Sequence, residues 1–192
     1  MFINTRLGEI HLKIVYYGPA LSGKTTNLEF IHARTNPKMR GDLVSLKTRE
    51  DRTIYFDFLQ LELGKIRGLK PKFSLYTVPG QTYYAASRDL VLQGSDGVVF
   101  VADSQAHRLV DNQESINSLK SYLHKMECEL NAFPFVLQCN KQDLPGALHP
   151  KELKVNLEQN GVSCFASVAV KGEGVFDTLK DIINQVVRGL IR

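Results

Sequence analysis

The sequence predicts an α/β fold, a three-layer sandwich built on a mostly parallel six-stranded sheet with an antiparallel hairpin at one edge. Apolar runs typical of strands alternate with segments of helical period along the chain. Two of these runs, at 98–101 and 135–137, are apolar at every position. Strands of that kind are buried on both faces, which requires helices on either side of the sheet.

The expected elements follow one another in the order of such a sheet. Strands are predicted at 10–17, 97–103 and 134–140, and helices at 24–35, 110–128 and 175–190. The last helix has an apolar stripe at three- and four-residue steps, formed by Phe176, Leu179, Ile183, Val186 and Leu190. Runs at 53–63 and 70–78 flank a short turn that begins and ends with glycine, and this pattern predicts the hairpin.

Length and composition limit how the chain is organised. The 192 residues, 43% of them hydrophobic, suffice for one buried core and are too few for two ordinary domains. We therefore expect a single domain over residues 1–192 that is monomeric when alone. The net charge of +4 arises from 24 basic and 20 acidic side chains spread along the chain. Because they form no basic stripe, we expect no nucleic-acid partner.

Membrane signals and metal-binding cysteine patterns are not found in the sequence. The apolar runs are far shorter than a bilayer-spanning helix, Phe2 stands where myristoylation needs glycine, and 189–192 lack a cysteine for prenylation. We expect a cytoplasmic protein with no direct lipid anchor, recruited to a cell pole or membrane-associated complex only through partners. Cys128, Cys139 and Cys164 are expected to be small core residues in a reducing compartment.

A glycine-rich loop follows the first predicted strand. Gly18 and Gly23 are separated by four residues and followed by Lys24 and Thr25. In this pattern backbone N–H groups face a β-phosphate, the lysine supplies a cation, and the hydroxyl ligates Mg²⁺. The alternative is a glycine turn that binds nothing. The nucleotide-binding residues predicted here are Gly18, Ala20, Leu21, Ser22, Gly23, Lys24, Thr25 and Thr26.

A second polar loop, Asn140 to Asp143, follows the strand at 134–140 and resembles the NKxD motif that recognises guanine. The Asp143 carboxylate would accept two hydrogen bonds from guanine, each worth ~1.5–3 kcal/mol, whereas adenine presents an acceptor there. The loop therefore favours GTP over ATP. Asn140 would tie this loop to the phosphate loop, and the stem of Lys141 would cover the purine ring. A polar turn that caps a strand is the alternative.

Two further segments carry weaker signals for the phosphate end of a nucleotide. After the strand at 70–78, Gly80 could present its backbone N–H to a γ-phosphate, and Gln81 could orient an attacking water. In the charged stretch before the hairpin, the Thr53 hydroxyl could complete the Mg²⁺ shell and sense the γ-phosphate. Alone, the first would be as typical of a helix start and the second of a solvated turn.

A third weak signal lies before the last helix. The segment Val168, Ala169 and Val170 could place a backbone N–H, that of Ala169, against guanine O6. A short strand end that contacts no ligand is the alternative interpretation.

Taken together in this order, the loops resemble those of a Ras-superfamily small GTPase, and most closely the branch that controls gliding motility and polarity in bacteria. The resemblance covers nearly the whole chain. Its most specific stretches are 13–19, 52–53 with 56–59, 75–81, 140–145 and 174–180.

The resemblance implies a role for several residues. Arg52 matches an arginine finger supplied by the same chain, Thr53 the switch threonine that ligates Mg²⁺, and Gln81 the glutamine that aligns water; with Lys24 they form the catalytic set. Thr77 replaces the usual aspartate and would reach Mg²⁺ only through water. The implied cofactors are Mg²⁺ and GTP or GDP. The implied partners are a roadblock-fold homodimer that activates hydrolysis and effector proteins of polarity or motility.

Ala20 departs from the pattern, because the family usually has glycine at this position. Its methyl group would crowd the γ-phosphate, where Gln81 and Arg52 must fit in the transition state, so hydrolysis is expected to be slow without an activating partner. This leaves two main hypotheses, a GTP-hydrolysing switch and a slowly hydrolysing GTP-binding scaffold subunit. A phosphate-loop kinase is a distant third, because it would leave the guanine-recognising loop unexplained.

Overall fold

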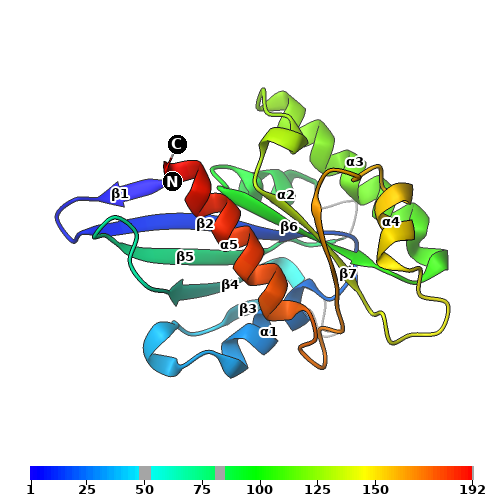
Figure 1. The fold of residues 1–192 in the computed structure, drawn as a ribbon, viewed down its shortest axis with the longest axis horizontal. Helices are drawn as coiled ribbons and strands as arrows, with labels where there is room; N and C mark the ends of the chain where they lie inside the picture. Colours follow the sequence, from blue (N-terminus) through cyan, green and yellow to red (C-terminus); the bar gives the residue numbers. More distant parts are fainter. Residues whose placement is uncertain (48–52, 81–84, 192) are drawn as a thin grey trace.

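The structure is a computed structural model that describes residues 1–47, 53–80 and 85–191 (Figure 1). It contains one sheet of eight strands in the order β3-β4-β5-β2-β6-β7-β8, with β1 paired to β2 outside this path. The strands are β1 Phe2–Asn4, β2 Glu9–Tyr17, β3 Val44–Lys47, β4 Thr53–Glu62, β5 Lys70–Thr77, β6 Gly97–Asp103, β7 Phe135–Asn140 and β8 Ser163–Ala166.

Helices cover both faces of the sheet, which makes the three layers. The α-helices are α1 Lys24–Arg34, α2 Ala85–Leu92, α3 Leu109–Lys125, α4 Pro150–Asn156 and α5 Val175–Ile191. Side chains of α1 and α5 join one buried cluster, and those of α2, α3 and α4 join the other. Figure 1 shows α5 crossing one face of the sheet, with α1 on the same side.

The residue pattern of β2 explains how one strand serves both layers. Ile10, Leu12 and Ile14 alternate along one face and pack with α1 and α5, while Val15 and Tyr17 point to the opposite cluster. β6, which is buried at all seven positions, lies between β2 and β7 as predicted for a central strand.

The predicted fold class is confirmed, and the sheet has two strands more than the six predicted. The hairpin of β4 and β5 is antiparallel, and β3 adds a further antiparallel strand outside it. The three short strands, β1, β3 and β8, have only three or four residues each. Runs that short show no reliable alternation, and neither the strands nor the short helices α2 and α4 could be recognised from the sequence.

The parallel strands position the candidate site. β5, β2, β6, β7 and β8 are neighbours that run in one direction, so their carboxyl ends share one edge of the sheet. Loops that follow these strands are where an open α/β sheet binds its ligands.

Candidate nucleotide-binding site

The phosphate loop connects β2 to α1 through backbone conformations that need glycine. Gly18 has φ 143° and Gly23, the residue before α1, has φ 101°, in the region that L-residues with side chains rarely adopt. A Cβ on Gly18 would lie 2.2 Å from the carbonyl oxygen of Val101, and one on Gly23 2.2 Å from Nδ2 of Asn140. The two glycines are therefore required by the close approach of β6 and of the Asn140 loop.

Lys24 is buried at the start of α1, with its ammonium folded over the loop. Its Nζ donates to the carbonyl oxygens of Gly18 at 2.9 Å and Pro19 at 2.6 Å. Burial lowers the pKa of Lys24 to about 7, an effect opposed by the nearby Asp57 carboxylate and reinforced by the positive charges of Arg88 and Arg108. A phosphate placed beside this ammonium would favour its charged form.

Asn140 joins three loops at the carboxyl edge of the sheet. Its Nδ2 donates to the carbonyl oxygen of Ser22 at 2.8 Å, and its Oδ1 accepts from the backbone N–H of Ala169 at 2.9 Å. One side chain thus holds together the loops at Ser22, Asn140 and Ala169, of which the first and second are 118 residues apart in the chain. Asp143 is exposed beside them and forms an ion pair with Lys171 at 3.4 Å.

Asp103, at the end of β6, is a site residue that sequence analysis missed. It is 1% exposed, and its Oδ2 lies 2.6 Å from Nζ of Lys141 and 3.8 Å from Nε of Arg108. Arg108 in turn donates through Nη2 to the carbonyl oxygen of Ala20 at 2.9 Å. This chain of contacts connects the Asn140–Asp143 loop to the phosphate loop by a second route.

A carboxylate at the opposite end of the phosphate loop was also missed. Asp57 on β4 is fully buried and accepts from the hydroxyl groups of Thr25 at 2.5 Å, Thr77 at 2.7 Å and Ser45. The backbone N–H of Asp57 donates to the Thr77 hydroxyl at 2.8 Å. Its neighbours on the same strand face, Leu59 and Leu61, are buried in the core. An acidic residue at a position where this alternation predicts a buried side chain was therefore the sequence signal for Asp57.

This donor set suits Mg²⁺, because hydroxyl and carboxylate oxygens are the ligands that this ion prefers. Thr25 and Asp57 provide both kinds of oxygen at one point beside the phosphate loop. Within residues 1–47, 53–80 and 85–191, no group of three or more His, Cys, Asp or Glu residues could hold a metal by itself. A divalent ion here would therefore depend on phosphate oxygens and water as additional ligands.

The remaining predicted residues are placed as follows. Gly80 lies after β5 and packs against the phosphate loop. A Cβ on Gly80 would lie 2.3 Å from the backbone nitrogen of Ala20. Ser22 is buried, whereas Leu21 and Val170 are exposed by 66% and 74%. Thr26 lies half-buried in the first turn of α1, and Val168 is buried beside Ala169. Thr53 is the first residue of β4, and the expected catalytic residues Arg52 and Gln81 lie outside the described residues.

The cysteine prediction needs correction. Cys139 is buried as expected, but Cys128 and Cys164 are partly exposed, and the sulfurs of Cys139 and Cys164 lie 3.4 Å apart. These two residues are 25 positions apart in the chain, and only the pairing of β7 with β8 brings them together.

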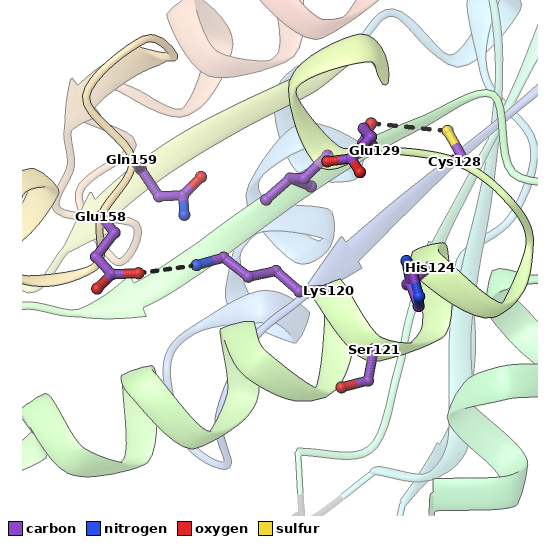
Figure 2. Close-up of a pocket in the computed structure, with 8 residues that line it drawn as sticks. Lys120, Ser121, His124, Cys128, Glu129, Glu158 and Gln159 are labelled. Carbon is purple, nitrogen blue, oxygen red and sulfur yellow. Dashed lines mark hydrogen bonds and ion pairs between the residues drawn. The ribbon is translucent and has the colours of Figure 1, made fainter.

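A separate pocket lies at the carboxyl end of α3 and shares no residue with the loops above. Figure 2 shows Lys120 and His124 of α3, Cys128 and Glu129 after it, and Glu158 and Gln159 after α4 around this pocket. None of the described helices combines the length and apolar character needed to cross a membrane.

Comparison with known proteins agrees with this geometry. Residues 1–186 match the model of the ADP-ribosylation factor family. The chain is 51% identical to "Mutual gliding-motility protein MglA" of Myxococcus xanthus over 189 residues, which cover 98% of this chain and 97% of that protein. It is 28% identical to ADP-ribosylation factor 3 of Arabidopsis thaliana (95% and 92% covered) and 29% identical to ADP-ribosylation factor-like protein 1 of Saccharomyces cerevisiae (91% and 88% covered).

Proposed function

The chain belongs to the ADP-ribosylation factor family of small GTPases, and we propose that it uses GTP binding and hydrolysis as a switch in bacterial gliding motility or cell polarity. The predicted small-GTPase identity is confirmed by the family match. The relation to the gliding-motility protein of M. xanthus supports the proposed process, because the two chains align over almost their full lengths.

The observation that supports nucleotide binding best is the position of Asn140. Its two hydrogen bonds, to Ser22 and Ala169, hold the phosphate loop and the segment after β8 around one edge. Guanine recognition is assigned to Asp143, whose carboxylate would accept from N1–H and the exocyclic amine. A labelled GDP that is displaced by GTP but not by ATP would support this assignment.

Asp143→Asn gives a sharper test of the same point. An amide would present a donor where guanine also presents a donor, whereas xanthine has a carbonyl there, so the variant should prefer xanthosine nucleotides. The loss of two charge-assisted hydrogen bonds predicts a fall in GDP affinity of at least about a hundredfold. Asp177→Asn, an exposed carboxylate change on α5, is the control. Unchanged GDP affinity in Asp143→Asn would contradict the assignment.

Mg²⁺ would be held by the oxygens of Thr25 and Thr53, with the Asp57 carboxylate beside Thr25. The ion would neutralise charge on the β- and γ-phosphates during hydrolysis. Around it, Lys24 would bind phosphate oxygens, Gln81 would orient the attacking water and Arg52 would stabilise the transferring group. Arg52→Ala should reduce stimulated hydrolysis about 10³-fold or more while GTP affinity is retained. Normal turnover in this variant would remove the arginine-finger assignment.

The partners proposed for the chain are a roadblock-fold, MglB-like homodimer that stimulates hydrolysis and effectors that bind the GTP state. Residues just before β4 and just after β5 are expected to change conformation with the γ-phosphate. Asp57 on β4 and Gly80 after β5 already contact the phosphate loop, at Thr25 and Ala20. The protein is proposed to be cytoplasmic and brought to a cell pole or membrane-associated complex by these partners. Single-turnover hydrolysis with and without a roadblock-fold homodimer tests the activating role.

A slowly hydrolysing scaffold subunit is the second candidate, and Ala20 favours it. The Ala20 backbone already lies in close contact with Gly80, so its methyl group adds bulk where the catalytic groups must converge. Ala20→Gly should accelerate intrinsic hydrolysis if crowding limits the rate. Phosphate release from wild-type protein over several hours distinguishes the two candidates, since the scaffold would retain GTP.

A further inference from the structure

Two cysteines of neighbouring strands lie in contact beside the guanine-recognising loop. β7 and β8 are parallel, and their register places Cys164 opposite Leu137 and Cys139 opposite Ala166. The two thiols are therefore diagonal neighbours on one face of the sheet, with their sulfurs 3.4 Å apart. A disulfide has an S–S length of about 2.05 Å, so forming one requires the two sulfurs, and with them the two strands, to move closer together.

The two thiols differ in exposure in the way that a reactive pair requires. Cys164 is partly exposed, whereas Cys139 is fully buried behind it. A hydrogen bond from the Cys139 thiol lowers the pKa of Cys164, with a smaller contribution from the charge of Lys154, while burial opposes the shift. The same hydrogen bond, together with burial, raises the pKa of Cys139. Cys164 is thus the more acidic thiol and the one that solvent can reach, and Cys139 is the thiol within reach of it.

The residues that follow both cysteines form the guanine end of the site. Cys139 directly precedes Asn140, and the backbone N–H of Ser167 donates to the Cys139 carbonyl oxygen at 2.9 Å. Two residues later, Ala169 donates to Asn140 Oδ1 at 2.9 Å, and Asn140 donates to the Ser22 carbonyl oxygen at 2.8 Å. Any change in the spacing of β7 and β8 is therefore passed to Asn140 through directly bonded or hydrogen-bonded neighbours.

We propose that Cys164 and Cys139 form a thiol-oxidation site for hydroperoxides, and that the disulfide formed there weakens guanine-nucleotide binding. In the first step the Cys164 thiolate attacks the O–O bond of the peroxide, giving Cys164 sulfenic acid and hydroxide. In the second step the Cys139 sulfur attacks the sulfenic sulfur, forming the disulfide and releasing water. A thiol reductant reverses the modification. Disulfides in a reducing compartment are usually transient, which suits a reversible site.

Formation of the bond and its effect on nucleotide are measured separately, since only the effect rests on the proposed function. Purified protein is treated with hydrogen peroxide, free thiols are alkylated, and peptide mass spectrometry identifies which cysteines are joined. We expect a Cys139–Cys164 disulfide, with Cys128 alkylated. Cys128 lies in the pocket of Figure 2, away from this pair, so Cys128→Ser should behave as wild type.

Variants of the pair separate the two steps. Cys139→Ala should stop at Cys164 sulfenic acid, which dimedone traps, and Cys164→Ser should neither form the disulfide nor react with dimedone at Cys139. A disulfide that instead includes Cys128, or the absence of the Cys139–Cys164 bond in native protein, would overturn the proposal. Because the wild-type chain gives this result by itself, a variant that folds poorly does not obscure it.

Binding of a fluorescent GDP analogue then tests the consequence. The oxidised protein should bind the analogue about tenfold more weakly than the reduced protein. A loss of this size is expected when one hydrogen bond of Asn140 is strained. Dithiothreitol should restore the affinity. An oxidised protein that carries the disulfide but binds GDP unchanged would overturn the regulatory part. Reduced protein that binds no GDP would contradict the proposed function and leave the oxidation site standing.

Discussion

The Thr25 hydroxyl donates to the Asp57 carboxylate over 2.5 Å and so connects the phosphate loop to the antiparallel part of the sheet. Thr77, which stands where this superfamily usually has an aspartate, donates to the same carboxylate at 2.7 Å. The carboxylate beside Thr25 thus comes from β4, and the end of β5 contributes a hydroxyl group to it. If Mg²⁺ binds at Thr25 as proposed, Asp57 is the acidic residue next to it.

Asp57→Asn tests this role for the carboxylate. The amide keeps the shape of the side chain but loses the charge that accepts three hydroxyl hydrogen bonds, at a cost of ~1.5–3 kcal/mol for each charge-assisted bond. GDP affinity in millimolar Mg²⁺ should fall about tenfold or more, while affinity in EDTA should change little. Titration with a fluorescent GDP analogue measures both values.

The control for this change is Asp42→Asn, which alters an exposed carboxylate and should leave both affinities unchanged. An equal loss of affinity with and without Mg²⁺ would mean that Asp57 only supports the fold. Thermal unfolding of the variant separates that structural effect from a defect in metal binding.

Arg108 is expected to act as a positioning residue for the phosphate loop. Arg108→Ala removes the hydrogen bond to the Ala20 carbonyl oxygen and the charge next to Asp103. Because Arg108 is 26% exposed, solvent reduces the effect to ~1 kcal/mol, which corresponds to about fivefold faster GDP release. Stopped-flow chase of a labelled GDP measures this rate.

Arg108→Lys should recover little of the loss, since an ammonium cannot contact Ala20, Asp103 and Asp111 with a planar fork. Arg188→Ala removes an exposed arginine from the far end of α5 and is the matched control. Full recovery with lysine would show that the positive charge matters and the geometry does not.

Gly80→Ala should push the phosphate loop away from the segment that follows β5. The new methyl group would lie 2.3–2.5 Å from backbone atoms of Pro19 and Ala20, which cannot rotate away. Overpacking of this kind costs ~1–3 kcal/mol, or roughly 2–12 °C in Tm for a domain of this size. Differential scanning fluorimetry and single-turnover hydrolysis should both show a loss.

Gly161→Ala is the control, because nothing lies within 4 Å of a Cβ at that position. Ala20→Gly should not rescue Gly80→Ala, since the close contacts are with backbone atoms that both residues share. A Tm equal to that of Gly161→Ala would mean that the two loops can move apart freely.

The pH dependence of alkylation should distinguish Cys164 from an ordinary cysteine. The hydrogen bond from Cys139 holds the pKa of Cys164 below its reference value of 9.0, so the thiolate is present at pH values where the denatured chain is still protonated. The iodoacetamide rate profile of Cys164 should therefore have its midpoint at lower pH in native than in denatured protein. Cys139→Ala should move that midpoint upward, whereas a native midpoint at or above the denatured one would refute the polarised pair.

Patterns local in sequence led to the loops of the candidate site, and the roles of their residues stay predictions. Gly18, Gly23 and Lys24 were recognised because a glycine-rich turn between a strand and a helix has a fixed spacing. Asn140 was recognised because its motif follows a run that is apolar at 135–137. The roles of Arg52 and Gln81 stay predictions, because both residues lie outside the described part of the chain.

Asp57, Asp103 and Arg108 were missed for a common reason. Each acts through a partner far away in the chain, such as Ala20 for Arg108 at a separation of 88 residues. A single charged residue in or after a strand has no motif around it, and its significance depends on what the neighbouring strand brings beside it.

The sequence by itself determined the fold class and the loop between β2 and α1, because hydrophobic periodicity and glycine spacing act within a few residues. The preference for guanine stays a prediction from the motif at Asn140 to Asp143. Only the tertiary structure decided that Asp57 lies beside Thr25 and that Cys139 touches Cys164. Both contacts arise from the register between strands that are distant in the chain. Register is set by the packing of whole faces against the helical layers, so it is a property of the assembled sheet.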